Sequence, residues 1–384
     1  MKTAPDTMDA ACRLRAWFQG AVLPLWVEHG YDHERGGFYE ALDMSGQPIL
    51  DLNRRVRVQS RQIYVMSQAS ILGWHEGAGA LADIAFENFL DKACPQMGIR
   101  GCAHILSPDG DVIDEKRDLY DQAFLLLAAA ARWQATGDQR ALDLAENVIR
   151  FLDKELTSPH GGWIESDHAD MPRRQNPHMH LFESFMALHE ATGDEKFAHY
   201  ADKVFQLFEK HFYDRDQQIL REFFKADLSV ADGESGQLIE PGHMMEWVWL
   251  LAQYEKQRKE KTLHYCDALF RSAKRLGTDK NSLFLVDNII LGADTNGTRR
   301  LWPQTEYLQA AMVMSQAGNK DAEKLVEDLS DACLKTYLTQ PVAGLWCDQF
   351  DVTGTPLTQQ VPASMLYHLI GAIVAIQPNN VPLG

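Results

Sequence analysis

The segment LYDQAFLLLAAAARWQATGDQRALDLAENVIRFLDKEL, residues 119–156, contains two stretches with helical periodicity on either side of Gly137-Asp138. Glycine commonly ends a helix, and aspartate commonly caps the start of the next one. The break recurs when Ala135-Thr136-Gly137-Asp138 is repeated as Ala191-Thr192-Gly193-Asp194, 56 residues later. A repeat of this length predicts pairs of helices that stack on neighbouring pairs.

Helical periodicity extends over most of the rest of the chain. It is clearest in residues 11–27, 59–72, 80–93, 179–192, 196–212, 244–256 and 321–337. Strand signals are short and lie beside glycines, at 36–39, 161–164 and 344–346, so we expect small β-hairpins in the connections. Because no Pro/Ser-rich linker or change of composition divides the chain, we predict one domain over residues 1–384.

A second regularity comes from polar residues in otherwise apolar helical surroundings. They recur with gaps of 60, 59, 63, 63 and 62 residues, at Arg61, Asp121, His180, His243, Glu306 and His368. Each step fits two helices and their connections, so six helical hairpins would close into an all-α (α/α)6 barrel. The inner helices would then direct polar side chains toward a common mouth. An irregular multi-helix protein with scattered polar residues is the alternative.

Composition limits the possible partners and location. The 384 residues carry 54 Asp and Glu against 37 Lys and Arg, a net charge of −17, which argues against nucleic acid or an anionic membrane as a partner. The longest apolar stretches, near 123–131 and 365–376, fall short of the ~18 residues needed to span a bilayer. No signal peptide is visible, and the six cysteines contain no CxxC pair. We therefore expect a cytoplasmic protein with reduced thiols.

Two segments share a His-x-x-Glu pattern just after a proline that starts a helix. In residues 176–183 the pair is His180 and Glu183, and in residues 240–247 it is His243 and Glu246. A nearby carboxylate fixes the tautomer of a histidine and raises its basicity. Surface helix starts with solvated histidines are the alternative. A dinuclear metal site is disfavoured because such bundles use the reverse order, Glu-x-x-His, so we expect neither metal nor cofactor.

Three further positions suggest a sugar site. Arg61 lies among four arginines in residues 54–61, which fits a solvated face, but the helix after it is apolar through Tyr64. A buried arginine is expensive unless it has a task, such as stabilising an oxyanion. Trp302 precedes a proline-started helix and could stack on a sugar ring, with Gln304 and Glu306 bonding hydroxyls, or it could be a core residue. His368 lies in an apolar helix, where a satisfied core histidine is the simpler interpretation.

The combination of these motifs resembles the N-acylglucosamine 2-epimerase superfamily, which includes mannose isomerases and cellobiose 2-epimerases. The resemblance covers nearly the whole chain and rests on residues 59–62, 119–124, 176–183, 242–247, 301–306 and 367–368. It implies an (α/α)6 barrel, with His243 and His368 as catalytic acid/base residues and Arg61 on a substrate oxygen. It also implies substrate contacts from His180, Glu246 and Trp302. Tyr64, Glu183, Asp121, Gln304 and Glu306 are further candidate substrate contacts.

The chemistry expected from this set is proton transfer next to an aldose carbonyl, through a cis-enediolate. Return of the proton to C1 gives a ketose, as in a mannose/fructose isomerase, which we favour. Return to C2 gives an N-acylglucosamine-type or cellobiose-type 2-epimerase. A glycoside hydrolase using Asp121 with Glu183 or Glu306, and a non-catalytic sugar-binding barrel, are more distant alternatives. The acidic charge favours a neutral monosaccharide, and the resemblance suggests a possible homodimer.

Overall fold

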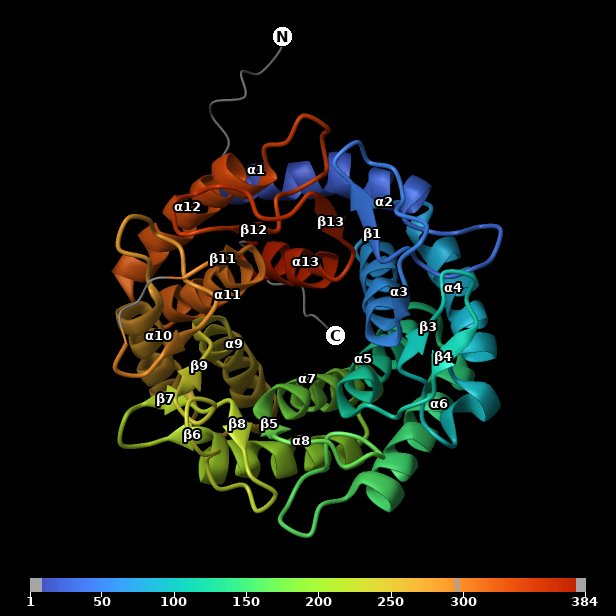
Figure 1. Ribbon diagram of the computed structural model, residues 1–384, viewed down its shortest axis with the longest axis horizontal. Helices are drawn as coiled ribbons and strands as arrows, with labels where there is room; N and C mark the ends of the chain where they lie inside the picture. The colour runs from blue at the N-terminus through green and yellow to red at the C-terminus, as the bar shows by residue number, and fades with distance from the viewer. Residues whose placement is uncertain (1–8, 294–296, 378–384) are drawn as a thin grey trace.

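Helices in two concentric rings form the protein (Figure 1). The computed structural model describes residues 9–293 and 297–377. The inner ring consists of α3 (Val56–Ile71), α5 (Leu119–Thr136), α7 (Gln175–Thr192), α9 (Pro241–Arg258), α11 (Trp302–Gln316) and α13 (Met365–Ala375). Each inner helix contacts the next, and α13 contacts α3, so the ring is closed. The expected (α/α)6 architecture is confirmed.

The outer ring covers the inner one. It consists of α1 (Ala10–Trp17) with α2 (Leu23–His29), α4 (Ala78–Lys92), α6 (Gln139–Phe151), α8 (Glu195–Leu207), α10 (Leu263–Gly277) and α12 (Lys320–Cys333). Short π-helical turns join or extend four of these helices: η2 (Phe18–Val22), η4 (Leu152–Leu156), η5 (Phe208–Phe212) and η6 (Leu334–Leu338). A 3-10 turn, η3 (Pro95–Gly98), follows α4. No described helix is both long and apolar enough to cross a membrane.

The difference between the two rings follows from the sequence. Residues 121–132 of α5 are buried on every side, as expected for a helix enclosed by neighbours. In α6 only one face is buried, and the other carries charged side chains toward solvent. The break between them is as predicted: Gly137 has a φ of +68°, and the side chain of Asp138 accepts from the backbone N of Arg140.

Short strands join neighbouring repeats around the mouth. Antiparallel pairs link β1 (Ala41–Asp43) with β13 (Gln360–Pro362), β5 (Arg173–Arg174) with β8 (Phe223–Phe224), β9 (Leu238–Ile239) with β10 (Ile289–Ile290), and β11 (Arg299–Arg300) with β12 (Gln349–Phe350). A three-stranded sheet contains β2 (Arg54–Arg55), β3 (Ile105–Leu106) and β4 (Val112–Asp114). The β1–β13 pair joins the first and last repeats.

The strands differ in one respect from the expectation. Only β3–β4 and the pair β6 (Tyr213–Asp214) and β7 (Ile219–Leu220) are local hairpins. At the expected positions 36–39 and 161–164 there are isolated bridges at Phe38 and Trp163, and residues 344–346 form no strand. Local turns satisfy many backbone groups of the connections, and bonds to the neighbouring repeat, such as Leu119 N to Glu165 O and Leu301 N to Asp348 O, satisfy others.

A buried amide or imidazole anchors four of the connections to their inner helices. Gln59, Gln122 and Gln304 each bond both the backbone N–H and C=O of one loop residue. His178 occupies the corresponding place in α7, where it accepts from the N of Trp163. These anchors position the first turns of the inner helices.

Candidate active site

A pocket of about 810 Å³ opens on the ring axis at the N-terminal ends of the inner helices. Six of the predicted site residues line it: Arg61, His180, His243, Glu246, Trp302 and His368. The remaining five, Tyr64, Asp121, Glu183, Gln304 and Glu306, do not line it. Because helix N-termini carry partial positive charge, their convergence favours negative charge developing in the pocket.

Arg61 is a buried cation without a carboxylate partner. Its Nη2 donates to the hydroxyl of Tyr120 at 2.9 Å, and its Cζ lies 4.0 Å from the centre of the Phe124 ring. Among the described residues no acidic side chain forms an ion pair with it, and its Nε has no hydrogen-bond partner. Burying an unpaired charge is costly. A guanidinium held this way is suited to an anionic oxygen on a ligand.

His243 is held by groups at both ring nitrogens. Its Nδ1 lies 3.0 Å from Oε2 of Glu222 and 3.6 Å from Oε2 of Glu240, and its Nε2 lies 3.1 Å from Nδ2 of Asn176. Burial by itself lowers the pKa of His243, but Glu222 and Glu240 raise it well above its usual value. The ring therefore favours the imidazolium form and can donate a proton.

Glu246 is not the hydrogen-bond partner of His243 that the His-x-x-Glu spacing suggested. Its Oε1 lies 3.7 Å from Nε2 of His180 instead. Side chains in helices lean toward the N-terminus, so His243 at the start of α9 reaches back to the connection that carries Glu222.

His368 has the opposite electrostatic environment. Its Nδ1 lies 2.8 Å from Oε1 of Glu306, and Glu306 also accepts from Nε2 of Gln309 at 2.6 Å. Burial, followed by the positive charge of Arg61, lowers the pKa of His368 well below its usual value. The imidazole is therefore neutral and can accept a proton. Glu306 acts on the pocket through His368.

Trp302 separates the two histidines. The centre of its ring lies 5.1 Å from that of His243 and 5.7 Å from that of His368. A half-buried aromatic face in this place provides an apolar wall against which a sugar can pack. Two imidazoles with opposite proton preferences thus share one pocket with a stacking surface between them.

Glu183 and Tyr64 lie behind the pocket. Nδ1 of His180 is 3.1 Å from Oε2 of Glu183, as the spacing predicted, and the hydroxyl of Tyr367 donates to both carboxylate oxygens at 2.6 Å. Glu183 and Tyr64 line a separate cavity deeper in the ring. Direct contact with a ligand in the pocket is therefore not the role that their positions support.

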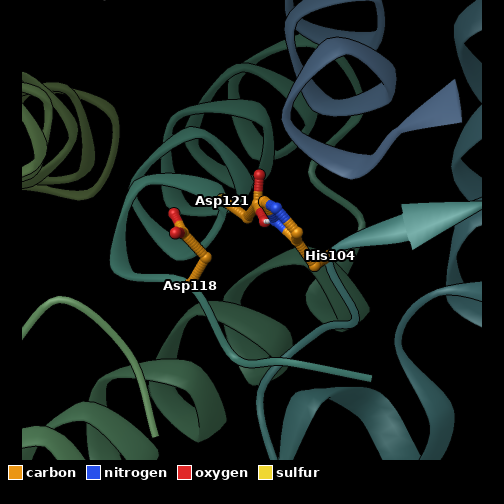
Figure 2. A group of neighbouring side chains, drawn as sticks. All are labelled: His104, Asp118 and Asp121. Atoms are coloured by element: carbon orange, nitrogen blue, oxygen red, sulfur yellow. Dashed lines mark hydrogen bonds and ion pairs between the residues drawn. The ribbon is translucent and has the colours of Figure 1, made fainter. Parts of the chain in front are cut away.

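Asp121 and Gln304 have structural partners. Figure 2 shows His104 against Asp121, with Asp118 apart from them. Asp121 is fully buried and also lies 3.4 Å from Nη1 of Arg57. Gln304 is fully buried and anchors Leu285. The sugar contacts expected for Asp121 and Gln304 are therefore not supported by their positions, because their polar atoms already bond other groups of the protein.

Four residues important to the pocket were missed or misjudged by sequence reasoning. Glu222 lies in the connection before α9, where no periodicity marked it. Phe124 supports Arg61 and lies 4.4 Å from the ring of His180, but an apolar residue gave no signal. Tyr120 was inside a quoted motif without a role. Asn176 was given no role in the pocket, but it lies in the first turn of α7, which begins at Gln175, and its amide contacts His243.

Three groups of side chains bring together enough oxygen and nitrogen atoms to hold a metal ion: His104 with Asp118 and Asp121, Glu222 with Glu240 and His243, and Glu246 with Glu306 and His368. In each group the histidine is already hydrogen-bonded to a carboxylate. Such pairing accounts for each cluster without an ion.

A two-histidine pocket with an unpaired arginine, inside an (α/α)6 barrel, defines a class of sugar isomerases and epimerases that move a proton next to a carbonyl. The sequence profile of the N-acylglucosamine 2-epimerase (GlcNAc 2-epimerase) family matches residues 37–372. The chain belongs to this family. The glycoside-hydrolase and sugar-binding alternatives are therefore set aside, because the chain is an isomerase or epimerase.

Individual relatives agree with this assignment. The chain is 34% identical over 379 residues to a mannose-6-phosphate isomerase of Rhizobium meliloti, covering 96% of both chains. It is 30% identical over 366 residues to a D-mannose isomerase of Thermobifida fusca, covering 89% of this chain and 88% of the relative. A crystal structure of a D-mannose isomerase superposes with a TM-score of 0.86 at 20% identity, covering 97% of this chain and 99% of the other.

Proposed function

We propose that the protein is an aldose–ketose isomerase that interconverts a mannose-type sugar with its ketose. The observation that carries this proposal is the pair His243 and His368, which line one pocket and have pKa values shifted in opposite directions. A proton transfer reaction needs one base and one acid ready at the same pH. The names of the two relatives described above support the isomerase outcome.

In this proposal neutral His368 removes the C2 proton of the open-chain sugar. Negative charge then develops on O1 as the cis-enediolate forms, and the unpaired guanidinium of Arg61 stabilises it. The protonated His368 returns the proton to C1, which gives the ketose. Glu306 keeps Nδ1 of His368 occupied, so that Nε2 is the atom that exchanges the proton.

His243 would donate a proton to O1 and take up the O2 hydroxyl proton as the C2 carbonyl forms, so that it returns to its starting state. Glu222 accepts the Nδ1–H, and Nε2 lies on the pocket side, 3.1 Å from Nδ2 of Asn176. As an imidazolium, His243 would donate its Nε2–H to a substrate oxygen in place of the Asn176 contact. His180, whose Nε2 faces the pocket beside Glu246, would assist opening of the sugar ring.

The pocket supports an unphosphorylated substrate. Each arginine at its rim other than Arg61 already has a carboxylate partner: Arg55 pairs with Glu40, Arg57 with Asp121 at 3.4 Å, and Arg300 with Asp287 at 4.0 Å. Glu240 and Asp348 add negative charge to the lining. A phosphate would have to compete with these pairs, so we favour mannose over mannose 6-phosphate.

Proton NMR of mannose in D₂O with the EDTA-treated protein tests this function. We expect fructose, with deuterium at C1 where the abstracted proton exchanges before its return. A His368→Asn variant should retain mannose binding and lose turnover. Turnover of mannose 6-phosphate but not mannose would overturn the substrate assignment, and unchanged turnover in the variant would overturn the role of His368.

A 2-epimerase is the second candidate. His243 and His368 lie on either side of Trp302, an arrangement that also supports protonation of C2 from the opposite face. Glucose formed from mannose, or N-acetylmannosamine formed from N-acetylglucosamine, would identify this outcome. The cytoplasmic location and the homodimer stay predictions, and sedimentation of the purified protein tests the latter.

A further inference from the structure

A second cavity lies behind the active pocket, between the inner helices. It is a narrow cavity. Its apolar lining comes from Leu127, Met186, Trp249 and Leu250, and its polar lining from Tyr64, Glu183, Glu190, Gln253 and Gln257. Glu190 is exposed, so the cavity reaches solvent. These residues lie further along α5, α7 and α9 than those of the active pocket, which is at the helix N-termini. The carboxylate, amide and hydroxyl groups along this partly apolar cavity offer hydrogen bonds to a few ordered waters.

Glu183 connects the two cavities. Its Oε2 lies 3.1 Å from Nδ1 of His180, whose side chain lines the active pocket. The Glu183 side chain is 18% exposed, and the cavity that it lines is the rear one. His180 and Glu183 therefore form an unbroken hydrogen-bonded pair, with one end at the substrate and the other at rear solvent.

We propose that His180 and Glu183 are a proton relay between a hydroxyl of the bound sugar and water in the rear cavity. The relay deepens the proposed function and rests on it, because it requires a sugar whose ring opens in the active pocket. It would give the bound sugar a route to solvent for one proton that does not pass through the mouth.

The relay moves one proton without making a histidine cation. Nε2 of His180 takes the O1 proton of the cyclic sugar as the C1–O5 bond breaks and the C1 carbonyl forms. Nδ1–H of His180 passes to the carboxylate of Glu183, so His180 stays neutral in its other tautomer. Glu183 then releases the proton to rear water. O5 takes one proton from solvent at the mouth, so the sugar keeps its proton count.

The electrostatics of both groups suit this task. Burial lowers the pKa of His180 to about 3, which disfavours a lasting imidazolium. Burial raises the pKa of Glu183 to about 7, against the hydrogen bond from Tyr367 and the charge of Arg61. The carboxyl can therefore both accept and release a proton near neutrality.

The other groups around Glu183 come from several inner helices, and the buried carboxyl of Glu306 on α11 is close enough for Glu183 to raise its pKa. Arg61 and Tyr64 belong to α3, Glu190 to α7, Glu246 to α9 and Tyr367 to α13, whereas α5 presents Leu127 and Ala131 to the rear cavity. Of these, Arg61 and Glu246 carry the charges that bear most directly on the pair.

The test measures ring opening separately from isomerisation. In a His368→Asn background, NMR exchange spectroscopy of 1-¹³C-mannose reports interconversion of the two anomers, which requires ring opening alone. We expect the His368→Asn protein to interconvert the anomers faster than they interconvert without protein. Adding the Glu183→Gln change should reduce this acceleration about 10²-fold. Glutamine keeps the acceptor for His180 and Tyr367 but cannot carry the proton.

Two further variants complete the design. Glu195→Gln, the same change on the exposed surface, is the matched control and should leave the rate unchanged. Ala187→Leu, which fills the rear cavity without reaching the active pocket, should slow anomer exchange. The acceleration should rise with pH through about 7 and become flat in Glu183→Gln, because Glu183 must be a carboxylate to accept the proton.

The outcomes separate the two proposals. Unchanged anomer exchange in Glu183→Gln, or no acceleration in His368→Asn, overturns the relay even if the native protein makes fructose. Full exchange in Ala187→Leu overturns the path to the rear cavity. If the native protein interconverts the anomers through Glu183 but makes no ketose, the relay is supported and the proposed isomerase activity is wrong.

Discussion

Nδ1 of His243 lies 3.0 Å from Oε2 of Glu222, a residue outside the inner ring of helices. The same carboxylate oxygen accepts from Nε2 of Gln175 at 2.9 Å, and Oε1 of Gln175 accepts from the indole of Trp247. His243 on α9, the proposed acid, is thus oriented by a connecting segment and a side chain of α7. The loop that precedes an inner helix determines the proton affinity of the residue on that helix.

Replacing Glu222 with glutamine should lower activity by about 10²-fold, because the imidazolium of His243 loses its main stabilising charge. The pKa of His243 is raised in the native protein, so a reaction that needs its acid form declines as pH rises through that pKa. In the variant this decline should move to lower pH. The pH profile of kcat measures the shift.

Glu234→Gln in the same connection serves as the control, because Glu234 is exposed and its side chain does not contact His243. An alkaline limb at the same pH in Glu222→Gln and the native protein would contradict the assignment.

Replacing Arg61 with methionine should abolish turnover and stabilise the fold. Loss of an oxyanion contact costs about 10²–10³ in kcat. The same change removes a buried charge that has no carboxylate partner and leaves an apolar side chain among aromatic rings. We expect a higher Tm by differential scanning calorimetry. A lower Tm would show that the cation–aromatic contacts outweigh the cost of burial.

His178→Gln should fold and should resist acid better than the native protein. Burial lowers the pKa of His178 to about 3, below its value in the unfolded chain. The unfolded state therefore binds more protons between about pH 6.5 and 3, and stability falls as pH falls through this window. Glutamine occupies the equivalent position in α3 and in α5, as Gln59 and Gln122. There its amide bonds both the N–H and the C=O of one loop residue, so it can anchor the loop in place of His178.

Urea unfolding at pH 5 and pH 8 measures this effect. The difference in unfolding free energy between the two pH values should be smaller in His178→Gln. An equal difference would mean that His180 and other groups dominate the acid sensitivity.

Gln304→Leu and Trp302→Ala should separate structural from substrate contacts. Gln304→Leu leaves the backbone N–H and C=O of Leu285 without partners, at about 1–3 kcal/mol for each buried group, so the Tm should fall with little change in KM. Trp302→Ala removes the wall between the histidines and should raise KM. If the Gln304→Leu protein folds but has a raised KM, Gln304 contacts the sugar after all.

Much of the architecture could be predicted from local chemistry. Gly137-Asp138 and its repeat at Gly193-Asp194 mark helix ends through backbone φ and capping, which depend on neighbouring residues alone. Spacing of about 60 residues placed Arg61, His180, His243 and His368 on inner helices. The step at Asp121 also falls on an inner helix, but there it is the neighbouring Tyr120 that lines the pocket.

The helical repeat, the ring and the chemical types of the residues at its mouth could all be predicted from the sequence, because periodicity, caps and spacing are local along the chain. The pairing of each histidine with its carboxylate depends instead on the folded structure. Glu222, Glu306 and Glu183 reach His243, His368 and His180, and two of these three pairs join residues from different segments. Proton affinity depends on burial and charge within a few ångströms, and those neighbours are brought together only when the ring closes.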